Sequence, residues 1–229
     1  MPNDLALLAE PRFVLVAWAA GLALVSGLVA LARLVGPGFT WLAGSVAALV
    51  GLSGAFGDDA WWARLGLILL ALGLIWARNR QLSGMFQVAA GLALLIQAMR
   101  VGAWAPALSA TLALGGVTGE MLLGHWYLVD PRLPRWALKS LALVAIVGLA
   151  FDSSVLAVAG LPSGGATIAF WVLMSTSIVL MGAVFASLRY PAYSGVMAAT
   201  GLSYLAMLTS LGGVFVGRVL VAGLGPFGN

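Results

Sequence analysis

The chain carries very little charge. Of its 229 residues, 8% are Asp, Glu, Lys or Arg, and 62% are hydrophobic. A soluble domain has about 25% charged and about 45–50% apolar residues, so this chain has too few charged side chains to cover a surface in water. The composition therefore excludes a soluble enzyme, a nucleic-acid-binding protein and a disordered tail, and it indicates a protein embedded in a lipid bilayer.

Cysteine is absent, and His125 is the single histidine. These two features exclude disulfides, thiolate metal sites, covalently attached c-type haem and iron–sulfur clusters held by cysteine. They also exclude haem held between two histidines of this chain, and we expect no metal site. The chain has no complete set of cofactor ligands of its own. A site for a quinone, or for a haem with one histidine ligand, is therefore possible only at an interface with another subunit.

Eight apolar runs are long enough to cross a membrane as helices, which takes roughly 17–25 residues each. The runs are continuously apolar, whereas the strands of a membrane barrel alternate with a period of two. We therefore predict an all-α, polytopic bundle of about eight spans that forms one membrane domain, with no soluble domain. The N-terminus lacks the basic segment of a secretory signal, so we expect the first run to be retained. The predicted spans are 12–34, 39–56, 60–77, 83–100, 107–129, 137–160, 167–188 and 193–221.

Lysine and arginine are distributed unequally between the two sides of these spans. One side carries Arg33, Arg78, Arg80, Arg132, Arg135, Lys139 and Arg189, and the other carries Arg12, Arg64, Arg100 and Arg218. The side with fewer cations also carries the acids Asp4, Glu10, Asp58 and Asp59. Because cytoplasmic loops are enriched in Lys and Arg, we expect both termini outside and loop 130–139 in the cytoplasm, in a bacterial inner (plasma) membrane.

The fifth span contains the densest set of polar candidates. Glu120 lies about 13 Å from the cytoplasmic end of the span, at 1.5 Å per residue, and it shares a helix face with Tyr127. A charged, unpaired carboxylate at that depth costs several kcal/mol, so we expect Glu120 to be neutral, paired or hydrated. Two interpretations stay open: an acid of a proton path or quinone site, and a protonated acid that holds helices together.

His125 lies about 6 Å from the same end of the span. It could act as a haem ligand, a proton carrier or a hydrogen-bond donor to a quinone carbonyl. The alternative is an interfacial histidine that belongs to an aromatic belt with Trp126 and Tyr127.

Asp152 is the second acid inside an apolar run, and Arg218 is expected on the same side of the membrane. A pair between Asp152 and Arg218, or between Asp152 and Arg100, would lower the cost of burying the acid. The alternative is that the sixth span ends near Phe151 and that Asp152 only caps it.

Segments 118–138 (TGEMLLGHWYLVDPRLPRWAL) and 190–218 (YPAYSGVMAATGLSYLAMLTSLGGVFVGR) resemble an uncharacterised family of multi-span bacterial membrane proteins. The number of spans is also loosely similar to that of NrfD-type quinone-interacting membrane subunits. No quinone-site motif of that group matches this chain residue by residue, so the resemblance implies no site here.

Two classes of function are consistent with these features. The first is a membrane subunit of a larger bacterial assembly, of electron-transfer or respiratory type. Such a subunit would contact other membrane subunits and line a quinone or haem pocket or a proton path, and it would not be catalytic on its own. The second is a stand-alone transporter of a small solute or an ion, with Glu120, Asp152 and the hydroxyl-rich last two spans along its path.

Overall fold

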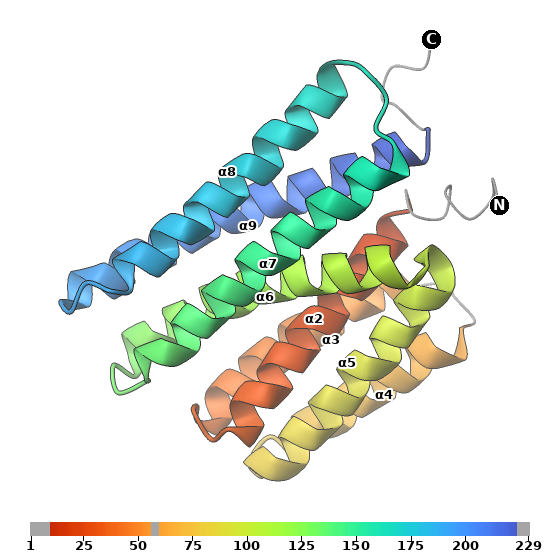
Figure 1. Cartoon of the computed structure of the whole chain (residues 1–229). Helices are drawn as coiled ribbons and strands as arrows, with labels where there is room; N and C mark the ends of the chain where they lie inside the picture. The colour runs from red at the N-terminus through yellow and green to blue at the C-terminus, as the bar shows by residue number, and fades with distance from the viewer. Residues whose placement is uncertain (1–9, 56–59, 224–229) are drawn as a thin grey trace.

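The computed structural model describes residues 10–55 and 60–223, and every regular element in these ranges is a helix (Figure 1). The predicted all-α membrane bundle is therefore confirmed. In chain order the helices are α2 (Pro11–Leu31), α3 (Pro37–Ala55), α4 (Trp61–Ile75), α5 (Arg80–Gly102), α6 (Trp104–Val129), α7 (Arg135–Ala159), α8 (Gly165–Ser187) and α9 (Tyr193–Val221).

Each predicted span overlaps one of the eight described helices, but one of these helices is short. Seven described helices are long and apolar enough to cross a membrane. The exception, α4, has 15 residues, which gives a length of about 22 Å at 1.5 Å per residue, against about 30 Å for the hydrocarbon core. It ends sooner than predicted because the chain turns at Trp76, where the backbone leaves the helical conformation, before the polar segment that starts at Arg78.

Residues at the helix ends explain where several helices begin. Pro11 and Pro37 open α2 and α3, where a missing backbone N–H is no loss because the first N–H groups of a helix have no partner within it. The side chain of Asn79 accepts a hydrogen bond from the backbone nitrogen of Leu82 at 3.2 Å, which caps the start of α5.

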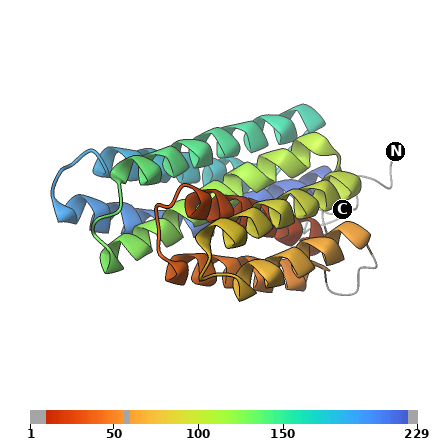
Figure 2. The same ribbon diagram turned by 90° about the horizontal axis from the view of Figure 1, so that it is seen from below.

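The helices form two groups of four, α2–α5 and α6–α9 (Figures 1 and 2). In each group the first helix packs against both the second and the fourth, so the group closes on itself. The two groups meet mainly where α2 packs on α6. Residue identities show no matching repeat, so the sequence alone gives only a faint indication of this division.

Gly21 and Gly115 let α2 and α6 come into backbone contact at this junction. A Cβ atom added to Gly21 would lie 2.7 Å from the Cα atom of Gly115, which is closer than real Cβ contacts. Small residues allow such close approach of helices in membranes. The junction is therefore tightly closed at this level of the bundle.

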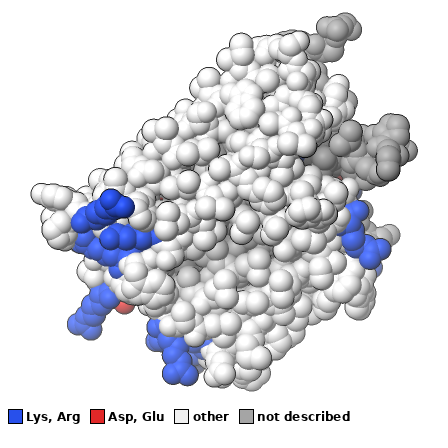
Figure 3. Space-filling model, in the orientation of Figure 1, with Lys and Arg blue, Asp and Glu red and all other residues white. Residues whose placement is uncertain are grey.

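Charged side chains gather at the two ends of the bundle, and the surface between them is uncharged on the face shown in Figure 3. We call the end that holds turns 32–36, 76–79, 130–134 and 188–192 the basic end. Large apolar side chains cover the middle, as at Val172 and Val179 of α8, which are 58% and 69% exposed. This distribution is that of an integral membrane protein whose helices contact lipid. Asp4, Asp58 and Asp59 lie outside the described residues.

Aromatic side chains are exposed near the starts of several helices, a position typical of residues at the membrane–water interfaces. Trp41, Trp61, Trp104 and Trp136 are each more than half exposed. Trp126 instead packs its ring against Phe39, with ring centroids 6.0 Å apart.

Candidate functional site

The candidate site lies along α6, the most buried of the seven long helices. Ser109, Glu120 and Tyr127 fall within about 20° of one another around the helix axis, at 100° per residue. All three are buried. Because α7 and α9 both pack on α6, this polar face points into the second group of helices rather than toward lipid.

Glu120 is fully buried, with 0% of its surface exposed. Neither of its carboxyl oxygens has a hydrogen-bond partner among the described residues. Ser203 of α9 is a polar neighbour of the carboxyl group, but its hydroxyl donates to the backbone carbonyl of Thr200 at 2.8 Å. Within the described residues the charged form of Glu120 has no ion-pair partner and no firm hydrogen-bond donor, so water or a cation must reach the carboxylate for it to ionise.

Gly124 leaves space between Glu120 and α9. A Cβ atom added to Gly124 would lie 2.8 Å from the hydroxyl oxygen of Thr200 and 3.6 Å from Oε1 of Glu120. The hydroxyl and the carboxyl group thus approach the same point beside Gly124. Thr200 donates its own hydrogen to the backbone carbonyl of Val196 at 2.9 Å, so its hydroxyl oxygen is left as an acceptor on the side of Glu120.

Asp152 and Arg218 form a buried ion pair, with both side chains 0% exposed. The guanidinium group donates from Nη1 to Oδ2 at 2.8 Å and from Nη2 to Oδ1 at 2.5 Å. Ser109 donates to the same Oδ1 at 2.6 Å. The carboxylate therefore accepts three hydrogen bonds, two of them from the guanidinium group. This geometry offsets the free-energy cost of burying the two charges.

Two further contacts complete the surroundings of Arg218. Its Nη2 donates to the carbonyl of Pro106 at 3.0 Å, and its Cζ lies 5.7 Å from the centre of the Phe13 ring. The Nε atom of Arg218 has no hydrogen-bond partner among the described residues. The cluster thus joins α9 and α7 to the first turns of α6 and α2.

These contacts decide between the alternatives that the sequence left open for Asp152. Asp152 does not cap a helix that ends near Phe151, because α7 continues to Ala159. The ion pair with the buried Arg218 compensates the burial of the acid in the middle of the helix. Arg218 lies inside α9, within the predicted span 193–221, and it is the predicted partner of Asp152. Arg100, the other partner considered for Asp152, is exposed.

His125 faces outward, in contrast to Glu120. Its side chain is exposed, and its Nδ1 lies 3.3 Å from the hydroxyl of Tyr204 on α9. Tyr204 is itself 44% exposed. Two hydrogen-bonded polar side chains therefore lie on the outer surface of the bundle, where α6 meets α9, and the described contacts do not link His125 to Glu120.

Tyr127 turns inward near the basic end, with 6% of its surface exposed. Its ring lies 6.4 Å from that of Tyr193 and 6.0 Å from the guanidinium carbon of Arg135. Arg135 also donates to the backbone carbonyls of Tyr190 and Pro191, at 2.5 and 2.8 Å. These hydrogen bonds hold the turn between α8 and α9 against the start of α7, so they indicate a structural role for Arg135.

A separate polar contact links the two groups of helices near the level of Glu120. The indole nitrogen of Trp18 donates to the hydroxyl of Thr118 at 2.9 Å, and that hydroxyl donates to the sulfur of Met207 at 3.0 Å. Sequence reasoning missed this link, as it missed the bond from Ser109 to Asp152. The helical period places Ser109 on the face of Glu120, which is the signal that would have identified it.

The described residues contain no group of three or more His, Cys, Asp or Glu side chains that could hold a metal ion. Comparison with protein-family models, curated proteins and solved structures finds no match to the chain. The polar side chains inside the bundle are therefore the features of the molecule that bear on its function.

Proposed function

We propose that this chain is the membrane-embedded subunit of a larger assembly, and that Glu120 takes up and releases a proton inside the bilayer. The observation that supports the proposal most is the contrast between the two buried acids. Asp152 uses both oxygens to bind Arg218 and Ser109, whereas the described contacts leave both oxygens of Glu120 unused. An acid kept only to join helices would be expected to form such bonds. Acids inside a membrane are otherwise typical of proton relays.

The surroundings favour proton exchange toward the basic end. On that side the hydroxyl of Thr200 approaches the same space as Glu120, and the His125–Tyr204 pair lies at the surface beyond it. On the other side, the hydrogen-bonded link from Trp18 through Thr118 to Met207 consists of an indole, a hydroxyl and a thioether, none of which takes up a proton near neutral pH. If the basic end is cytoplasmic, as the excess of Lys and Arg favours, the proton comes from the cytoplasm.

The proposed assembly is of electron-transfer or respiratory type, with a quinone or haem held at an interface between subunits. The exposed pair of His125 and Tyr204 supports an interface, because polar side chains rarely face lipid. A partner subunit or the head of a quinone that covered the pair would give both side chains polar contacts. His125 could donate to a quinone carbonyl from this position.

A stand-alone transporter is the second candidate. The division into two groups of four helices favours it, since several transporters consist of two repeats. In such proteins the substrate site lies at the interface of the repeats. Glu120 instead lies within the second group, and the junction between the groups is closed by Gly21 and Gly115. The geometry therefore supports the subunit better.

Purification of the tagged chain from its native membrane in a mild detergent, followed by mass spectrometry, tests the assembly. We expect stoichiometric membrane partners, with a quinone or haem in the preparation. A chain that elutes alone, with no bound redox molecule, would contradict the subunit proposal and favour the transporter.

Proton uptake by the purified assembly in liposomes, followed with a pH-sensitive dye, tests Glu120. We expect E120Q and E120L to assemble normally and to lose proton uptake. D130N, which changes an acid in the turn between α6 and α7, is the matched control and should retain it. If both variants of Glu120 take up protons like the wild type, Glu120 is only structural.

A further inference from the structure

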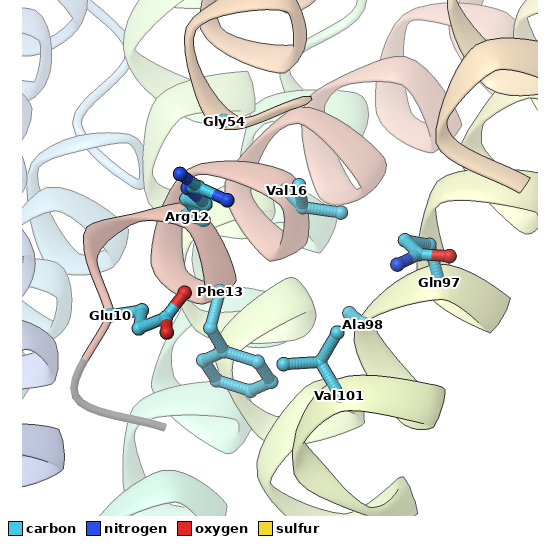
Figure 4. Close-up of a pocket in the computed structure, with 8 residues that line it drawn as sticks. All are labelled: Glu10, Arg12, Phe13, Val16, Gly54, Gln97, Ala98 and Val101. Atoms are coloured by element: carbon cyan, nitrogen blue, oxygen red, sulfur yellow. The ribbon is translucent and has the colours of Figure 1, made fainter. Parts of the chain in front are cut away.

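A cavity of about 280 Å³ opens at the end of the bundle opposite the basic end, between α2, α3 and α5. Its walls are formed by Glu10, Arg12, Phe13, Val16, Gly54, Gln97, Ala98 and Val101. Figure 4 shows Glu10 and Arg12 on one side of this space, at the start of α2, and Gln97 facing them from α5. The cavity shares none of its lining residues with the surroundings of Glu120.

The rim of the cavity carries one charge of each sign. The carboxylate of Glu10 and the guanidinium group of Arg12 are both exposed, and both line the same space. The described contacts include no ion pair between them; the ion pair found within the described residues joins Arg218 to Asp152. The two groups therefore present a negative and a positive charge, two residues apart, to a molecule that enters.

The inner part of the cavity is mostly apolar, in contrast to its charged rim. Gln97 is 5% exposed and brings an amide group to the wall. The remaining walls are apolar, formed by Phe13, Val16 and Val101 among others. Ligand pockets usually have volumes of about 300–1,000 Å³. This cavity is at or below the lower end of that range, so it is too small for a quinone or a whole lipid and suits a small molecule or one headgroup.

We propose that the cavity binds a small zwitterion, in which an ammonium group and a phosphate or carboxylate group are joined by a short spacer. The ammonium group is attracted to Glu10, and the acidic group accepts charge-assisted hydrogen bonds from Arg12. The short carbon spacer lies against the apolar wall, beside the amide of Gln97. A free solute and the headgroup of a phosphatidylethanolamine lipid share this chemistry.

Calorimetric titration of the full chain in phosphatidylglycerol nanodiscs tests the site, with O-phosphoethanolamine as the probe. We expect saturable binding, which E10Q and R12Q each weaken about tenfold, since each removes one charge-assisted contact. R100Q is the matched control, because Arg100 is an exposed arginine of the same end that does not line the cavity. It should leave the Kd within about twofold. Size-exclusion chromatography verifies that each variant is folded.

Ethanolamine and inorganic phosphate, titrated separately, distinguish a zwitterion site from a site for one charge. Both should bind at least about tenfold more weakly than O-phosphoethanolamine. Repeating the titration in nanodiscs that contain phosphatidylethanolamine identifies the natural source: a raised apparent Kd indicates competition by the lipid headgroup, and an unchanged Kd indicates a free solute. Three results would overturn the proposal. They are the absence of saturable binding of O-phosphoethanolamine, binding of inorganic phosphate with the same Kd as O-phosphoethanolamine, and binding of O-phosphoethanolamine by R12Q with the Kd of the wild type.

Discussion

Removal of the Asp152 carboxylate should strongly destabilise the protein. In D152L, Arg218 loses the two hydrogen bonds of 2.8 and 2.5 Å to the carboxylate. Among the described residues it keeps only the Pro106 carbonyl at 3.0 Å and the Phe13 ring as partners. Breaking a buried pair by removing one partner costs about 3–5 kcal/mol, because the other charge stays buried and unpaired. We expect the free energy of unfolding of D152L to fall by that amount.

A double-mutant cycle isolates the pair from the loss of the side chains themselves. R218M should also destabilise, because it leaves the Asp152 carboxylate with Ser109 as its donor. The double variant D152L/R218M should be destabilised by less than the sum of the two, with a coupling energy of at least about 2 kcal/mol, since it leaves no unpaired charge.

Equilibrium unfolding in mixed micelles, with increasing dodecyl sulfate and tryptophan fluorescence as the signal, measures these differences. D130N is the control, because Asp130 lies in a turn, where substitutions usually change stability by less than about 0.5 kcal/mol. A cost below about 1 kcal/mol for D152L, or effects that simply add in the double variant, would refute the buried bidentate pair.

Two further substitutions test the junction between the groups of helices. G21A should destabilise the bundle by about 1–3 kcal/mol through overpacking against α6. G182A should not destabilise it, because its added Cβ meets no atom within 4 Å and alanine is the better helix former; equal unfolding midpoints for the two would contradict the close contact. T118V should cost about 1 kcal/mol and shift the fluorescence of Trp18, because the indole loses its acceptor at 2.9 Å; an unchanged emission spectrum relative to the wild type would argue against that bond.

The positions of the helices could be predicted from sequence because their physical cause is local. The backbone N–H and C=O groups of a continuous apolar run can form their hydrogen bonds within a bilayer only if the run is a helix. Each of the eight runs overlaps one helix. The shortness of α4 was not predicted, since its apolar character continues into Trp76 and Ala77 while the backbone has already turned.

The pairing of polar side chains could be predicted only in part, because it depends on how the helices pack. Sequence reasoning gave Asp152 two alternative arginines, and nothing local distinguishes Arg218 from Arg100. The helical period does show that Glu120 and His125 point in different directions. It does not show that the direction of Glu120 is interior, which follows from the packing of α7 and α9 on α6. The zwitterion cavity combines α2, α3 and α5, so no single segment indicates it.

Infrared difference spectroscopy of the protein in liposomes tests the proposed proton site at Glu120 most directly. A change of the pH outside the liposomes should change a carboxyl C=O stretching band, as Glu120 takes up or releases its proton. The band should be absent in E120Q and present in D130N. A wild-type spectrum with no carboxyl band that responds to pH, or a band that persists in E120Q, would contradict the account.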